Sequence, residues 1–87
     1  MMKKNYKDEM VKIVGNALDG LNLTVYDCFY EKEGTFNCLR VVLDSPEVIT
    51  IDTIVEATKI INPLIDKQED FIQEKYILDV YGKAKGE

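Results

Sequence analysis

The sequence contains no histidine. Histidine is the commonest general base and a frequent metal ligand, so its absence excludes most catalytic triads and the usual zinc sites. A phosphate loop is also missing, because the one glycine- and lysine-rich stretch, residues 82–86 (GKAKG), has no helix behind it. We therefore expect neither enzymatic activity nor a cofactor.

Long apolar stretches are lacking as well. The longest, residues 39–43 and 60–65, are far shorter than the roughly 20 residues that cross a bilayer. The lysines near the start are followed by a stretch that Lys12, Gly15 and Asn16 interrupt, which does not fit a secretory signal. We expect no membrane segment.

The chain has 87 residues, of which 46% are hydrophobic. A chain of this length forms a single core, and this composition can supply one. We expect one domain over residues 1–82 and a flexible tail over residues 83–87.

Positive charge is scarce. Sixteen acidic residues against 11 basic ones give a formal charge of −5, which repels phosphate backbones and favours a basic protein partner. Lys83 and Lys85 in the tail leave open a limited contact with RNA. Their alternative role is to keep the end of the chain solvated.

The spacing of apolar residues predicts a helix over residues 5–19, which Asn5 caps and Gly20 ends. Gly15 inside this helix marks either a close approach to a sheet or simple tolerance. β-Branched and aromatic residues predict strands over residues 23–31 and 36–44, which a glycine-containing turn joins into a hairpin.

Alternation along the hairpin assigns side chains to its two faces. Leu39, Val41 and Leu43 share one face of the second strand and form the better core candidate, and Arg40 lies on the other. On the first strand, Tyr26, Cys28 and Tyr30 are expected to point inward.

The two cysteines fall on opposite faces in this register. Cys28 points inward and Cys38 outward, and side chains on opposite faces cannot meet disulfide geometry. We predict two free thiols, although a slip of one residue would bring both to the same face.

A second helix is predicted to start after Thr50, with a kink or end near Ile61 or Asn62 because Pro63 removes a helical hydrogen bond. Phe71 and Ile72 are expected to plug an edge of the core, and residues 75–81 to form a third strand. The order α-β-β-α-β predicts an α+β fold, a two-layer sandwich with both helices on one face of a three-stranded sheet. The position of the third strand stays open.

The other face of the sheet would be free for a partner. Phe36, Phe29 and Val42 would share it with Arg40, which is either a ligand for a partner or the ion-pair partner of Asp27 or Glu31. Carboxylates at Asp44, Glu47 and Asp52 suggest a hard cation, but capping of a turn explains them and we expect no metal.

Several short motifs occur in an order and spacing that resemble a known family, the N-terminal domain of the ribosome maturation factor RimP. That family reads L-G-L-E-L-V-D-V, a glycine turn, L-R-V-Y-I-D, V-T-L-D-D and Y-x-L-E-V. The corresponding segments here are Leu21-Asn22-Leu23, Tyr26-Asp27, Glu33-Gly34, Leu39-Arg40-Val41, Leu43-Asp44, and residues 48–52 and 76–80.

The resemblance implies a cytoplasmic factor that binds the small (30S) ribosomal subunit or its proteins and assists its maturation without catalysis. It also implies a C-terminal SH3-like β-barrel, for which this chain has no residues. Within the matching motifs, Arg40, Asp44, Asp52 and Asp79 occupy family positions. We predict a partner-binding set of Arg40, Asp44, Phe36, Lys83 and Lys85.

One other function stays open, a general protein-interaction module unrelated to ribosomes, with a homodimer through the open sheet face as one form of it. RNA binding of the KH kind needs a GxxG loop between helices, which the sequence lacks.

Overall fold

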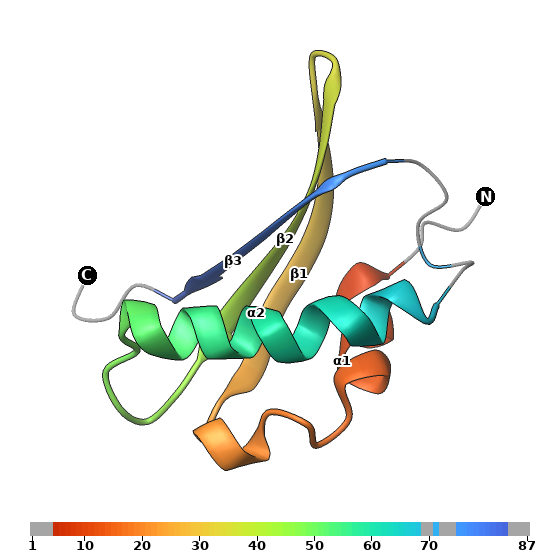
Figure 1. Ribbon diagram of the computed structural model, residues 1–87. Coiled ribbons are helices and arrows are strands. Elements are labelled where there is room, and N and C mark those ends of the chain that lie inside the picture. The colour runs from red at the N-terminus through yellow and green to blue at the C-terminus, as the bar shows by residue number, and fades with distance from the viewer. Residues whose placement is uncertain (1–4, 69–70, 72–74, 84–87) are drawn as a thin grey trace.

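A computed structural model describes residues 5–68, 71 and 75–83. The elements follow in the order α1 (Tyr6–Val14), a 3-10 turn η1 (Asp19–Leu21), β1 (Thr24–Glu33), β2 (Phe36–Asp44), α2 (Ile51–Asp66) and β3 (Ile77–Gly82). Figure 1 shows α2 crossing in front of the three strands. The α+β fold and the order of elements are as predicted.

The three strands form one sheet in the order β1-β2-β3, so β2 is the central strand. β1 and β2 are antiparallel and joined by the predicted tight turn, while β2 and β3 are parallel, because α2 carries the chain back across the sheet. This arrangement places the third strand beside the second.

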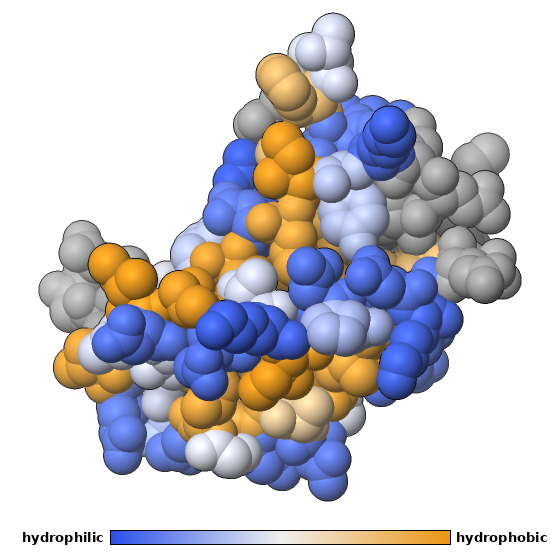
Figure 2. Space-filling view, in the orientation of Figure 1, coloured by the Kyte–Doolittle hydropathy of each residue, from blue (hydrophilic) through white to orange (hydrophobic). Residues whose placement is uncertain are grey.

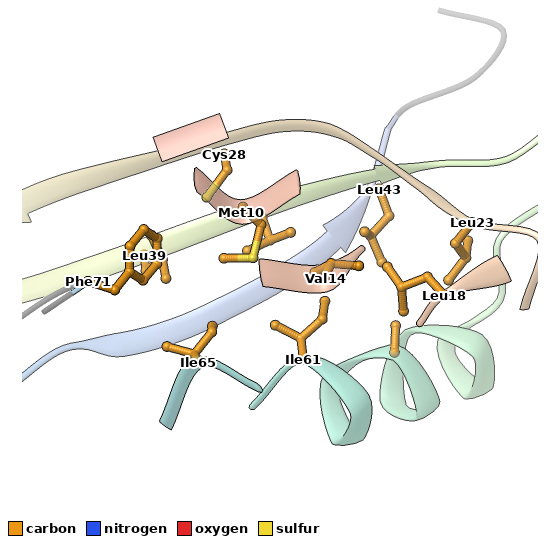
Figure 3. Close-up of a cluster of buried hydrophobic side chains, with 12 residues drawn as sticks. Met10, Val14, Leu18, Leu23, Cys28, Leu39, Leu43, Ile61, Ile65 and Phe71 are labelled. Carbon is orange, nitrogen blue, oxygen red and sulfur yellow. The ribbon is translucent and has the colours of Figure 1, made fainter. Parts of the chain in front are cut away.

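The core lies between the sheet and the two helices (Figure 3). Met10 of α1, Ile61 of α2 and Leu39 of β2 are completely buried. Leu39, Val41 and Leu43 all belong to this cluster, so the predicted core face of β2 is confirmed. Phe71 also packs in the core as predicted, while Ile72 lies outside the described residues. Both helices therefore cover the same face of the sheet.

The first helix is shorter than predicted. Asn5 caps its start, accepting a hydrogen bond of 3.0 Å from the Asp8 amide, but the helix ends at Val14. Gly15 is the C-cap, with φ 56° and ψ −126°. An added Cβ there would meet no atom within 4 Å, so Gly15 serves neither a close approach nor a continuing helix. It turns the chain.

The second helix is longer than predicted. Thr50 caps it, as expected, through a 3.2 Å bond from the Thr53 amide, yet Pro63 lies inside it and does not end it. The helix continues because Ile65 is one turn beyond Ile61 and is buried with it in the core. Burying such a side chain stabilises by about 1.5–3 kcal/mol, comparable to the roughly 3 kcal/mol that an internal proline costs.

A bulge in β1 changes which side chains point inward. The register shifts between Val25 and Asp27, which pair with Leu43 and Val42. Tyr26 is the extra residue, and its ring lies beneath the Lys83 ammonium on the side of the sheet without helices. The prediction that these side chains point toward the core was wrong for Tyr26 and right for Cys28.

The cysteines are free, as predicted. Cys28 pairs with Val41, a core residue, whereas Cys38 pairs with Glu31 and lies outside the core cluster. The hairpin register therefore keeps the two thiols on opposite faces.

Candidate partner-binding surface

The sheet face opposite the helices carries no element among the described residues, and we call it the open face. Strand pairing sets its members, because paired residues point to the same side and alternate along each strand. The open face includes these paired residues: Thr24, Asp27, Phe29, Glu31, Phe36, Cys38, Arg40, Val42, Asp44, Ile77, Asp79 and Tyr81. Tyr26, at the bulge, and Lys83, directly after β3, meet each other and complete it. The predicted grouping of Phe29, Phe36, Arg40 and Val42 is confirmed.

Apolar side chains stand out from the open face. Phe36 is 60% exposed, Ile77 52%, Tyr26 47% and Tyr81 37%, whereas Cys38 and Val42 are buried beneath them. Figure 2 shows a row of hydrophilic side chains along α2 with hydrophobic ones beside it, and Ile51 and Val55 of this helix are also exposed. Exposed aromatic residues above an ordered sheet are typical of surfaces that bind a partner.

Arg40 lies at the centre of the open face between two carboxylates. Its Nε donates to Glu31 Oε1 at 2.6 Å and its Nη1 to Asp79 Oδ2 at 2.6 Å. The sequence suggested Asp27 or Glu31 as the ion-pair partner of Arg40 on β1, and the structure shows Glu31. The guanidinium thus links β1 and β3 across β2, which gives it a structural role whether or not it also meets a partner.

Asp44 and Lys83 are also engaged within the chain. Asp44 Oδ1 accepts a 2.8 Å bond from the Ser45 amide and holds the turn after β2. The Lys83 ammonium lies 4.3 Å from the centre of the Tyr26 ring, a cation–π contact. Lys85 lies outside the described residues.

The predicted binding residues share a face but not a pocket. Phe36 begins β2, Arg40 is in its middle and Asp44 ends it, so the outer two are roughly 26 Å apart at the usual rise of a strand. Such spacing suits contact with a macromolecule, because a small ligand would not span it.

The comparison with protein families decides which class of domain this is. The family model described as the RimP N-terminal domain matches residues 13–81, more than three quarters of the chain. The chain belongs to the RimP N-terminal domain family. Membership implies a role in ribosome maturation, and RimP is a non-catalytic maturation factor.

Sequence reasoning missed three open-face residues of this RimP domain, namely Tyr26, Ile77 and Tyr81. Ile77 and Tyr81 alternate with Leu78 and Val80, which pack against the core, so a period of two already separated them. The outward position of Tyr26 does not follow from a period of two, because it results from a bulge, and a bulge forms only when two strands pair.

The other polar groups described in this RimP domain form neither a metal site nor a membrane-spanning segment. Among residues 5–68, 71 and 75–83, no group of three or more histidine, cysteine or carboxylate side chains is placed to hold a metal. Ser45 Oγ accepts a 3.1 Å bond from the Glu47 amide, so the acidic segment before α2 forms a capped turn. In the same part of the chain, no helix has both the length and the apolar character to cross a membrane.

The buried thiol of Cys28 is held in its protonated form. Burial, together with the negative charge of Asp27, raises its pKa from 9.0 to about 12. A thiol with so high a pKa is a poor nucleophile at neutral pH. We conclude that Cys28 serves packing.

This shifted pKa predicts a pH dependence of stability. Below pH 9 the thiol is protonated in both states, but between pH 9 and about 12 the unfolded chain ionises while the folded chain does not. The free energy of unfolding should therefore fall as pH rises through this window. Urea unfolding at several pH values measures this effect. The free energy of unfolding should fall less steeply with pH in Cys28→Ala than in the unchanged protein, and equal slopes would contradict the prediction.

Proposed function

We propose that this domain supports maturation of the small (30S) ribosomal subunit in the cytoplasm by binding, without catalysis, to that subunit or one of its proteins. The family match over residues 13–81 carries the proposal. The open face is the proposed contact surface, with Phe36, Arg40, Asp44 and Lys83 taking part.

The charge of the domain favours a protein component over bare RNA. The net charge is −5, and the Arg40 guanidinium already lies between two carboxylates. Asp27 adds a further negative charge to the same face. A basic ribosomal protein complements this surface, and RNA contact would be limited to the lysines at the end of the chain, Lys83 and Lys85.

Sedimentation of a tagged copy with cell lysate tests the proposal. We expect the domain to migrate with free small subunits on a sucrose gradient. Phe36→Ala should weaken binding at least tenfold, since truncating an aromatic hot spot of an interface costs about 2 kcal/mol or more. Val55→Ala is the matched control, because Val55 is 44% exposed and belongs to α2, on the other side of the sheet.

Two outcomes would contradict the proposal. A folded domain absent from the small-subunit fractions would exclude ribosomal binding by this domain. Equal loss with Phe36→Ala and Val55→Ala would exclude the open face as the contact surface. Circular dichroism of each variant shows whether it is folded.

A general interaction module that forms a homodimer through the open face is the second candidate. The exposed apolar side chains of this face favour it. Light scattering at rising concentration would then show a doubled mass that Phe36→Ala prevents, with no migration alongside ribosomal subunits.

A further inference from the structure

The two edge strands of the sheet are protected to different degrees. β1 is interrupted by the bulge between Val25 and Asp27, and charged residues such as Asp27 and Lys32 occur along it. Bulges and charges are the devices that keep an edge strand from pairing with another chain. β3 pairs with β2 without a register shift, and its one charged residue, Asp79, is bound to Arg40. The β3 edge is therefore the less protected of the two.

The free edge of β3 presents a defined set of backbone groups. The Lys83 amide donates to the Leu43 carbonyl of β2 at 2.7 Å. Because backbone groups alternate along a strand, the odd-numbered residues of β3 face β2, and Leu78, Val80 and Gly82 face outward. Within the described part of the chain, no strand lies beyond β3 to meet them.

We infer that β3 pairs antiparallel with β3 of a second copy of this chain, with Val80 opposite Val80 at the twofold axis. In this register Leu78 lies opposite Gly82 of the second copy, so every outward N–H and C=O of these three residues finds a partner. Two neighbouring registers lose part of this pairing. The one centred on Asp79 sets two carboxylates face to face and pairs Gly82 with Tyr76, and the one centred on Tyr81 pairs Leu78 with residue 84; both of these partners lie outside β3. Only the Val80 register pairs all three outward residues within the strand, and a second copy of the chain supplies an edge of matching length.

Side chains on the open face agree with this register. Asp79 lies opposite Tyr81 of the second copy, and Ile77 lies opposite Lys83, whose apolar stem can cover it. The pairing would cover one side of Ile77 and Tyr81, two of the exposed apolar residues. A charge of −5 on each copy opposes association, so added salt should strengthen it.

Two measurements on the intact chain test the pairing, which does not depend on the proposed function. Sedimentation equilibrium from micromolar to millimolar concentration should show a monomer–dimer equilibrium. Amide hydrogen exchange by NMR should slow with concentration at Leu78, Val80 and Gly82 and stay unchanged at the exposed tip residue Thr35. A dimer formed face to face through the open face would not protect these three amides selectively.

A matched pair of variants at Ile77 tests the register. Ile77→Lys sets like charges opposite each other twice per dimer and should weaken association roughly tenfold, whereas Ile77→Glu faces Lys83 and should not weaken it. Net charge alone predicts the reverse, since the lysine lowers the net negative charge. A monomer at all concentrations, unprotected amides at Leu78, Val80 and Gly82, or equal weakening by both variants would each overturn the inference.

Discussion

Replacing Ile61 by alanine is expected to lower the free energy of unfolding by about 2–5 kcal/mol. Ile61 is completely buried in the centre of α2, between the sheet and α1. Its truncation removes apolar contacts on both sides and leaves a cavity that the surrounding β2 and α1 residues cannot fill without moving. A domain of this size is stable by only roughly 5–10 kcal/mol, so much of that stability would be lost.

Ile51 of the same helix supplies the control. It is 81% exposed, so Ile51→Ala should change the free energy of unfolding by less than about 0.5 kcal/mol. Urea unfolding followed by circular dichroism measures both variants. Comparable destabilisation by Ile61→Ala and Ile51→Ala would show that Ile61 does not face the sheet.

The parts of the fold that the sequence predicted are governed by local geometry. Leu39, Val41 and Leu43 point to one side because side chains in any extended strand alternate. Asn5 and Thr50 cap helices because their short side chains accept from amides only three residues away. Such features do not depend on where the rest of the chain lies.

The features that sequence reasoning missed depend on contacts between distant segments. Arg40 and Asp79 are separated by 39 positions, so their ion pair follows from the placement of β3 beside β2. The bulge at Tyr26 depends on how β1 pairs with β2. The continuation of α2 past Pro63 depends on the burial of Ile65 against other elements.

The same division applies to the candidate site. The sequence predicted an open face with Arg40 and Phe36 on it, because alternation assigns them there. The sequence offered Glu31 as an ion-pair partner of Arg40 and a turn cap as the role of Asp44, and the structure shows both contacts. The sequence did not predict the second ion pair of Arg40, with Asp79, or the contact of Lys83 with Tyr26. Among the predicted residues, Phe36 is therefore the clearest probe of binding, since its side chain is exposed and its removal breaks no ion pair.

Gly15→Ala is expected to destabilise the domain by about 1–3 kcal/mol. At φ 56° and ψ −126°, Gly15 has a backbone conformation that residues with a Cβ rarely adopt. The cost would be conformational, because an added Cβ meets no atom within 4 Å. Strain at this point would oppose the turn that directs the chain from α1 toward η1 and β1. Thermal and urea unfolding of the variant measure the loss.

Gly20→Ala separates this backbone effect from the general effect of replacing glycine. Gly20 lies in η1, has no positive φ, and an added Cβ there also meets open space. Alanine should restrict the unfolded chain without straining the fold, and so stabilise the domain by about 0.4–1 kcal/mol. The two substitutions add the same methyl group, so opposite signs would identify backbone conformation as the cause. Equal effects at Gly15 and Gly20 would instead show that the end of α1 does not need glycine.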